Sequence, residues 1–243
     1  MTEQPSLEPL DESTFETVLC VVAHPDDLEY GVAAAVDRWV RAGKTVTYLL
    51  ATRGEAGIET MPPAEAGPLR EQEERDGAAR VGVEVVEFLD GFHDGVVEHG
   101  LALRKGIARE IRRRRPDLLV TVTYADRFPG GMANQADHRA VGLAVVDAKA
   151  DAGNRWIFPE LVEEGHEPWQ VAHVLVCADP EPTHFVDVSE HFDAAVASLS
   201  AHDAYLAALG SHYPEPAELL AQILGGPAEV TGVPYAVTGR VIG

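Results

Sequence analysis

Apolar, strand-like segments alternate with helix-like segments through the first half of the chain, and this alternation constrains the fold more than any other feature. The expected strands are short runs rich in β-branched residues, at 18–23, 45–51, 83–89 and 118–123. Helical patterns follow them at 32–42, 69–81, 101–115 and 138–150. Because the connections are short, each crossover should return to a parallel neighbour. The pattern predicts an α/β fold: a doubly wound, mostly parallel, Rossmann-like sheet with helices on both faces.

The second half of the chain departs from this alternation. Residues 153–169 form a polar insertion that carries aromatic side chains. Further strands are expected at 171–177 and 185–188, followed by a helix over 188–209 that begins at Ser189. This half therefore predicts an elaborated C-terminal part of the sheet.

The two ends of the chain show weaker patterns. Residues 214–243 are rich in Gly and Pro and match no element. Residues 1–16 are polar and acidic, and we expect them to form a frayed tail. We expect one domain over 17–243, a length that can bury a sizeable core.

Acidic residues outnumber basic ones by 40 to 19, so the formal net charge is −21 at pH 7. Such a charge repels nucleic acid and anionic membranes. The arginine run at 112–115 ends a predicted helix, where the helix dipole favours cations. We therefore expect neither nucleic acid nor a membrane as a partner.

No apolar run approaches the ~20 residues that span a membrane, and the first residues lack the basic and apolar parts of a signal peptide. Cys20 and Cys177 lie in strand-like segments and are expected to be small buried hydrophobic residues rather than a disulfide or a metal pair. These features predict a cytoplasmic protein.

Polar side chains follow the first predicted strand directly, in the turn His24-Pro25-Asp26-Asp27. Ligands bind at the carboxyl ends of strands in such sheets. His24 and Asp27 can face one ion there, and Asp26 would then be free to act as a general base beside it. The competing interpretation is a turn whose aspartates cap a helix.

A second polar motif, Asn134-Gln135-Ala136-Asp137-His138-Arg139, follows the fourth predicted strand. With His24 and Asp27 it makes one carboxylate and two imidazoles, a three-ligand set for a divalent ion. Zinc suits this set best, and a fourth position would stay open for water. A metal site with an open position is of the catalytic type. Zinc lowers the pKa of a bound water to roughly 7, so a hydroxide is available at neutral pH.

The two motifs together resemble the LmbE-like, or PIG-L, family of zinc-dependent N-deacetylases, which act on N-acetylglucosamine-type sugars. The resemblance covers most of residues 17–151 and includes 52–55 and 112–117. It implies zinc ligation by His24, Asp27 and His138, with Asp26 as the general base. It further implies that sugar contacts come from Arg70 and Asp94, and that Asp137 supports the site by orienting a histidine.

The sequence departs from the family pattern at Gln135, where relatives often carry a histidine that helps to stabilise the oxyanion or to protonate the leaving amine. Glutamine can donate a hydrogen bond to an oxyanion but cannot supply a proton. His93, next to Asp94, is the first candidate to replace that histidine, and His202 is the second. A further departure is Leu28, which stands where a glutamate usually follows the aspartate pair.

The sequence predicts a zinc-dependent hydrolase that removes an N-acyl group, acetyl being the expected one, from an amino sugar or related small molecule in natural-product or thiol metabolism. One alternative is an amidase acting on a thiol conjugate or a natural-product intermediate. Another is a metal-bearing binding protein with little or no turnover. The expected partner is a small N-acylated molecule, and the sequence leaves open whether the protein forms a homo-oligomer.

Overall fold

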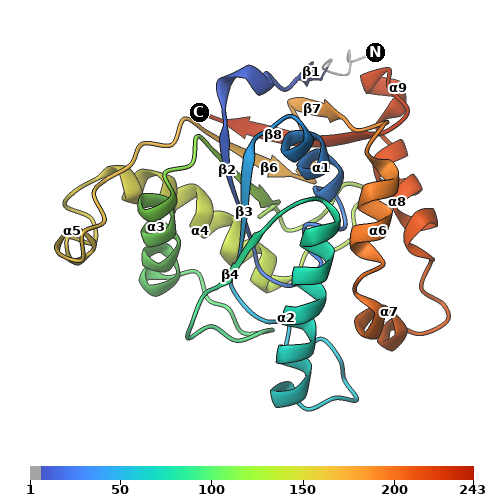
Figure 1. The fold of residues 1–243 in the computed structure, drawn as a ribbon, viewed down its shortest axis with the longest axis horizontal. Coiled ribbons are helices and arrows are strands. Elements are labelled where there is room, and N and C mark those ends of the chain that lie inside the picture. The colour runs from blue at the N-terminus through green and yellow to red at the C-terminus, as the bar shows by residue number, and fades with distance from the viewer. Residues whose placement is uncertain (1–6) are drawn as a thin grey trace.

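The computed structural model describes residues 7–243, which form a central eight-stranded sheet in the order β1-β7-β8-β6-β5-β2-β3-β4 (Figure 1). The strands are β1 (Glu8–Pro9), β2 (Thr17–Val22), β3 (Thr45–Leu50), β4 (Val85–Phe88), β5 (Leu118–Val122), β6 (His173–Cys177), β7 (His184–Asp187) and β8 (Ala236–Ile242). Strands β6, β5, β2, β3 and β4 are parallel, whereas β8 runs antiparallel to β6 and β7. The predicted doubly wound, mostly parallel α/β fold is confirmed.

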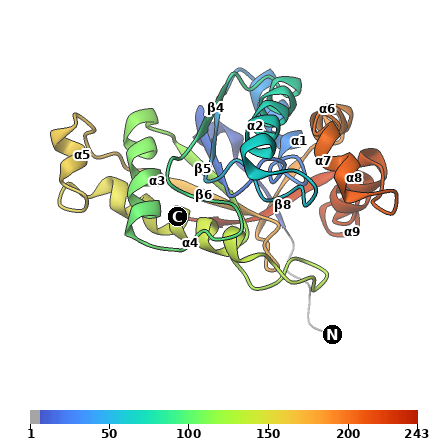
Figure 2. The same cartoon turned by 90° about the horizontal axis from the view of Figure 1, so that it is seen from below.

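Helices cover both faces of the sheet (Figure 2). They are η1 (Glu12–Thr14), α1 (Ala33–Arg41), α2 (Pro63–Arg80), α3 (Leu101–Arg114), α4 (Ala136–Gly153), α5 (Glu160–Glu163), α6 (Phe192–Leu199), α7 (Asp203–Leu209), α8 (Pro216–Gly225) and α9 (Ala228–Thr231). Helices α3 and α4 pack together on one side, and α1, α2, α6 and α8 lie on the other.

Strand β2 shows how the sequence builds two cores. Cys20 and Val22 belong to the core beneath α1, while Leu19 and Val21 belong to the core beneath α3 and α4. All four side chains are fully buried, as expected for a parallel strand covered on both faces. Because both faces of this strand are covered, it cannot accommodate unpaired polar side chains. The polar turn that follows β2 therefore lies at the edge of the sheet, where the strand ends.

The predicted helix over 188–209 is wrong as a single element. The structure has two helices there, α6 and α7, separated at Ser200–His202. The break turns His202 inward, where its side chain is 0 % exposed. Helical periodicity missed the break because both pieces are rich in apolar and alanine residues.

Other expectations need smaller corrections. Helix α2 begins at Pro63, well before the expected 69, since Pro is well suited to the first turn of a helix. Residues 214–243, left unassigned by the sequence, contain α8, α9 and the internal strand β8.

The frayed tail expected at 1–16 is not what the structure shows for residues 7–16. Glu8–Pro9 pairs in parallel with β7, and Phe15 is buried with its ring edge against Trp39. Residues 1–6 lie outside the described part of the chain. Among residues 7–243, none of the helices has the length and apolar character that a membrane crossing requires.

Candidate metal centre

The two polar motifs meet at the edge where parallel strands end. The turn holding His24 and Asp27 follows β2, and His138 lies in the first turn of α4, after β5. Because β2 and β5 are neighbouring parallel strands, their carboxyl ends bring the motifs together across more than a hundred residues. Ligand atoms of the three side chains lie within 4.8 Å of one another.

The hydrogen bonds of Asn134 fix the tautomer of His138. The Asn134 amide nitrogen donates to the carbonyl oxygens of Thr123 and Ala125, at 2.8 and 2.9 Å. Its oxygen therefore faces His138 Nδ1, 2.9 Å away, and that ring nitrogen must donate. The Nε2 lone pair is left pointing inward with no hydrogen-bond partner among residues 7–243, although Asp27 Oδ1 is only 3.0 Å away. The His138 Nε2 lone pair and the Asp27 carboxylate are both hydrogen-bond acceptors, so a cation between them would stabilise the pair.

His24 is oriented in a similar way by carboxylates. Its Nε2 lies 3.2 Å from Asp137 Oδ2 and 3.0 Å from Asp94 Oδ1, so Nε2 donates. Nδ1 is then available for an ion, and it lies 3.8 Å from Asp27 Oδ2. Burial lowers the pKa of His24, but the three carboxylates outweigh it and raise that pKa to about 12. Without a metal, the imidazole ring is therefore expected to be protonated on both nitrogens. The surroundings of Nδ1 thus favour a positive charge, which a metal ion could supply in place of the proton.

The Asp27 carboxylate is held by the backbone of its own turn. Its Oδ2 accepts hydrogen bonds from the backbone N–H groups of Ala23 and His24, at 3.0 and 2.9 Å. Burial raises the pKa of Asp27, yet the imidazoles of His138 and His24 hold it well below its usual range. Asp27 therefore stays ionised with Oδ1 directed at His138. One carboxylate and two imidazole lone pairs fit a divalent ion of the zinc type.

Asp26 lies beside this centre in a strained conformation. Its φ of 86° is in the left-handed region, which costs a non-glycine residue about 1–3 kcal/mol. The Glu74 carboxylate accepts a hydrogen bond from its backbone N–H at 3.0 Å. Burial, opposed by Arg70 and reinforced by Asp27, raises the pKa of Asp26 to about 7. A carboxyl group with such a pKa can both accept and release a proton near neutral pH.

Arg70 lies under the turn and is 2 % exposed. Its guanidinium donates to the Pro25 carbonyl at 2.6 Å, lies 3.2 Å from Asp26 Oδ1 and stacks on the Tyr205 ring. Gly54 leaves room for it, because a Cβ there would collide with the guanidinium. The structure thus places the charge of Arg70 against the carboxyl group of Asp26.

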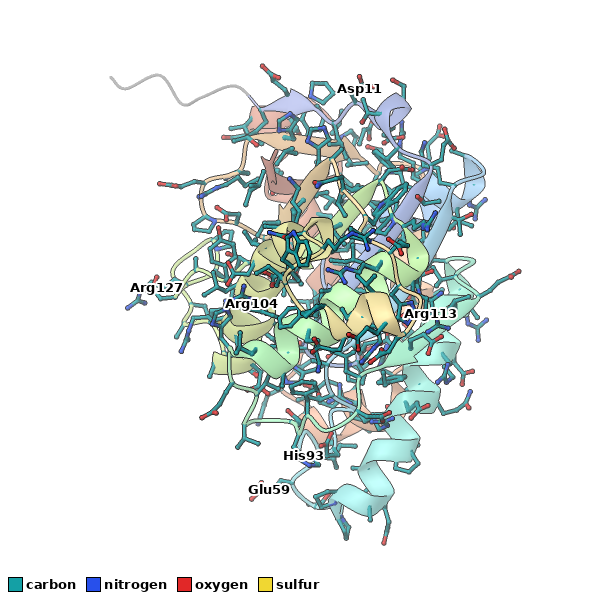
Figure 3. All side chains as sticks on the ribbon, turned by 90° about the vertical axis from the view of Figure 1, so that its left-hand side faces the viewer. Asp11, Glu59, His93, Arg104, Arg113 and Arg127 are labelled. Atoms are coloured by element: carbon teal, nitrogen blue, oxygen red, sulfur yellow. The ribbon has the colours of Figure 1, made fainter. Side chains whose placement is uncertain are left out.

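Two predicted residues lie at the rim. Gln135 is exposed at the N-cap of α4, and within residues 7–243 its side chain has no hydrogen-bond partner. The His93 side chain is 76 % exposed and lies 3.2 Å from Glu55. Figure 3 shows His93 at the same end of the molecule as Glu59, opposite Asp11. The structure brings Asp94 and Asp137 to the centre, and leaves His93 and Gln135 outside its hydrogen bonds.

Sequence reasoning assigned no role to Asn134 and Glu74, which position His138 and Asp26 through hydrogen bonds. Asn134 stands four residues before His138, a spacing that predicts contact at a helix start and could have been read. Glu74 reaches Asp26 from 48 positions away, and only the packing of α2 under the turn reveals it.

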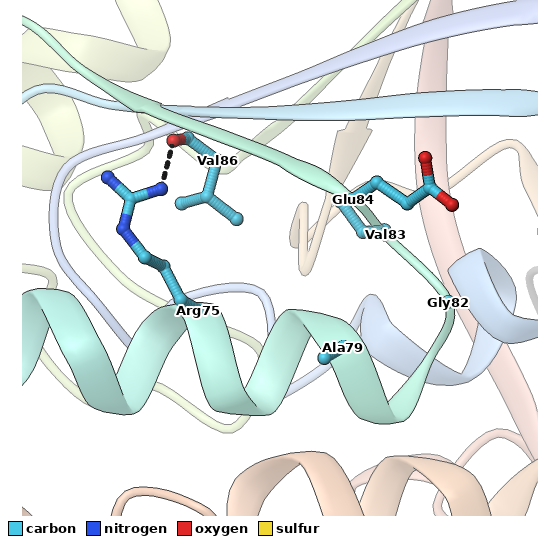
Figure 4. Close-up of a pocket in the computed structure, with 6 residues that line it drawn as sticks. All are labelled: Arg75, Ala79, Gly82, Val83, Glu84 and Val86. Atoms are coloured by element: carbon cyan, nitrogen blue, oxygen red, sulfur yellow. Dashed lines mark hydrogen bonds between the residues drawn. The ribbon is translucent and has the colours of Figure 1, made fainter.

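A surface depression lies elsewhere on the molecule. It has a volume of about 380 Å³ and lies between the end of α2 and the edge strand β4. Arg75 donates to the carbonyl of Val86 at its margin, at 2.7 Å (Figure 4). Its lining includes none of the ligand residues described above, so this depression is not the metal centre.

Known proteins resemble this chain in sequence and in fold. The family described as PIG-L, GlcNAc-PI de-N-acetylase, matches residues 19–149. A diacetylchitobiose deacetylase of Thermococcus kodakarensis is 27% identical over 76% of this chain and 68% of its own length. A 1D-myo-inositol 2-acetamido-2-deoxy-alpha-D-glucopyranoside deacetylase of Kineococcus radiotolerans is 33% identical over 74% of this chain, which spans only 56% of that relative.

A solved structure shares the whole architecture. The N,N'-diacetylchitobiose deacetylase of Pyrococcus horikoshii superposes with a TM-score of 0.83, at 21% identity, over 95% of this chain and 85% of that one. At this identity the likeness establishes the fold. The family match includes β2 through most of α4, and so every predicted metal ligand. The chain belongs to the PIG-L, or LmbE-like, family.

Proposed function

We propose that this protein is a zinc-dependent N-deacetylase that hydrolyses the acetamide of an amino sugar. The observation that carries the proposal is that ligand atoms of His24, Asp27 and His138 converge. In each histidine, a hydrogen bond at one ring nitrogen leaves the lone pair of the other nitrogen, His24 Nδ1 or His138 Nε2, available for the ion. The family description and the names of the relatives supply the substrate class, an N-acetylated amino sugar.

Zinc bound by these three side chains would polarise the amide carbonyl and make water more acidic. Asp26 lies next to the ligand Asp27 and is proposed to take the proton from the attacking water. The same carboxyl would then hand that proton to the leaving amine, since the pKa of about 7 allows transfer in both directions. One proton carrier suffices, so the chain does not need a histidine at position 135.

The remaining residues are assigned by their position. Gln135, exposed beside the first turn of α4, would donate its amide N–H to the developing oxyanion. Asp94, 11 % exposed on its side chain, would meet the sugar hydroxyls, and Arg70 would act mainly through Asp26. His93 at the rim would contact the more distant part of the substrate.

Amine release from a substrate panel tests the function. Purified protein would be incubated with N,N'-diacetylchitobiose, an N-acetylglucosaminyl inositol and an N-acetylated thiol conjugate, and free primary amine would be measured. We expect release from at least one of the two sugars at a rate well above that of Asp26→Asn. Release from the thiol conjugate alone would favour the amidase alternative. No release from any substrate by zinc-loaded protein would favour the binding-protein alternative.

A further inference from the structure

A second group of metal-ligating side chains lies buried behind the turn. Glu29, Glu74 and His202 are each 0 % exposed, and ligand atoms of all three lie within 4.8 Å of one another. His202 Nε2 lies 3.9 Å from Glu29 Oε2 and 3.8 Å from Glu74 Oε2. The three come from the segment after β2, from α2 and from the break between α6 and α7.

Four polar atoms of this cluster have no hydrogen-bond partner among residues 7–243: Glu29 Oε2, Glu74 Oε1 and both ring nitrogens of His202. Two of them, Glu29 Oε2 and His202 Nε2, face each other at 3.9 Å. Glu29 Oε1 accepts from Ser198 Oγ, and Glu74 Oε2, which lies 3.8 Å from His202 Nε2, accepts from the Asp26 backbone. Buried polar atoms are nearly always bonded, so unpartnered atoms on three adjoining side chains point to an occupant of the cluster.

Helix α2 leaves space for an occupant at this point. Gly77 lies inside α2, where glycine weakens a helix relative to alanine. A Cβ at Gly77 would come within 3.1 Å of His202 Nε2 and 3.4 Å of Glu29 Oε1. It would come equally close, 3.1 Å, to the backbone oxygen of Ser198, so the glycine serves both the close packing of α2 on α6 and the space around His202.

Charge also favours a cation here. Glu29 and Glu74 lie behind Asp26 and Asp27, and all four carboxyl groups are buried. Arg70 pairs with Asp26 on the other side of the turn and does not reach the unpartnered oxygens of the cluster. An isolated buried carboxylate is very costly, so such a group is paired, bound to a metal or held protonated, and a divalent cation would replace the protons here.

We propose that Glu29, Glu74 and His202 bind a second divalent cation, distinct from the one at His24, Asp27 and His138. Two carboxylates and one imidazole suit an ion of the manganese-to-zinc series. The separations of 3.8 and 3.9 Å match the 3.8 Å between His24 Nδ1 and Asp27 Oδ2 at the first centre. Through Glu74, this ion would hold the strained backbone of Asp26 in place.

Metal content of the intact protein tests the proposal. The full chain would be produced in medium supplemented with zinc and manganese, and ions per chain would be measured by plasma mass spectrometry. We expect about two equivalents, falling to about one after brief chelation, since the second cluster is closed to solvent. An anomalous difference map should show a peak between Glu29, Glu74 and His202.

Variants separate the two sites. His202→Gln and Gly77→Ala should each lose about one equivalent and keep the ion at His138, whereas His138→Gln should keep the buried ion. His191→Gln is the matched control. His191 also contacts a buried carboxylate, that of Asp37 at 2.7 Å, but it belongs to none of the three-residue groups of possible metal ligands found in residues 7–243. The variant should retain both ions.

The number of ions per chain in wild type and variants separates the possible outcomes. If wild type binds one equivalent of metal, His138→Gln binds none, and no anomalous peak lies at the buried cluster, the second site is overturned and the proposed deacetylase is unaffected. A single equivalent that survives in His138→Gln and disappears in His202→Gln would support the buried site and contradict the first one. Two equivalents that remain in both His202→Gln and Gly77→Ala would also overturn the proposal.

Discussion

Asp26 combines backbone strain, burial and opposing charges in one side chain. Its φ lies in the left-handed region, and its Oδ1 faces Arg70 while Asp27 Oδ1 faces His138, so the two neighbouring carboxyl groups have different partners. Arg70 stabilises the carboxylate form, while burial and Asp27 favour the protonated form. The resulting pKa near neutrality suits a proton carrier.

Replacing the base should remove turnover and leave the metal. We expect Asp26→Asn to lower kcat about 10²–10⁴-fold, because the amide is nearly isosteric but cannot accept the proton. Steady-state kinetics and metal content would be measured on the same preparation. Full activity would remove Asp26 from the mechanism, and a loss of metal would make it a ligand instead.

Arg70 should act on the pH profile as well as on binding. If Asp26 is the base, as proposed, its carboxylate is the active form, and activity should fall as the pH drops through its pKa. Arg70→Met removes the charge that lowers this pKa, and the acidic limb of kcat/KM should move to higher pH. Arg70→Lys, which keeps the charge, should move it less. A raised KM with an unshifted limb would make Arg70 a substrate contact only.

Asn134 should control metal affinity through His138. Outer groups that orient a ligand typically contribute 10–100-fold in affinity, so Asn134→Ala should weaken binding by about that factor. Asn134→Asp keeps an acceptor for His138 Nδ1 and should weaken it less. Competition with a chelator of known affinity measures both, and equal affinities for wild type and Asn134→Ala would refute the role.

At the scale of elements, strand ends decide where chemistry occurs. The apolar runs of β2 and β5 could be read from the sequence, and the rule for parallel sheets then places His24 beside His138. The turn inward at His202 and the pairing of Glu8–Pro9 with β7 could not be read in this way. Both depend on tertiary packing between segments distant in sequence, which leaves no local periodicity.

Asp117 should fix the start of β2 against β5. Its Oδ2 accepts from the backbone N–H groups of Glu16 and Thr17, each at 2.9 Å. We expect Asp117→Asn to lower the free energy of unfolding by about 1 kcal/mol, a modest figure because the carboxylate is partly exposed. Urea denaturation would measure it, with the exposed Asp11→Asn as a control expected to change little.

The pH dependence of this difference has a definite sign. Burial raises the pKa of Asp117, but its hydrogen bonds outweigh that and lower it from 3.8. The folded carboxyl is therefore the stronger acid, and its stabilising effect is present above pH 3.8 and lost as the pH falls through the lowered value. A gap between wild type and Asp117→Asn that widened on acidification would contradict this assignment.

At the scale of the whole molecule, the C-terminal part of the chain supports a candidate site whose predicted ligands lie between residues 24 and 138. Helix α7 stacks Tyr205 on Arg70, and the break before it supplies His202. Sequence motifs predicted the ligands because each motif is local, and missed this support because it depends on packing between distant segments. The cytoplasmic location and the oligomeric state stay predictions.

The central claim is that hydrolysis depends on an ion held by His24, Asp27 and His138. The most direct test is the rate of amine release from N,N'-diacetylchitobiose, or from the best substrate of the panel, as zinc is titrated into chelator-stripped protein. We predict a rate near background without zinc, a rise to a plateau, and no rise in His138→Gln. An undiminished rate in fully stripped wild-type protein would contradict the account.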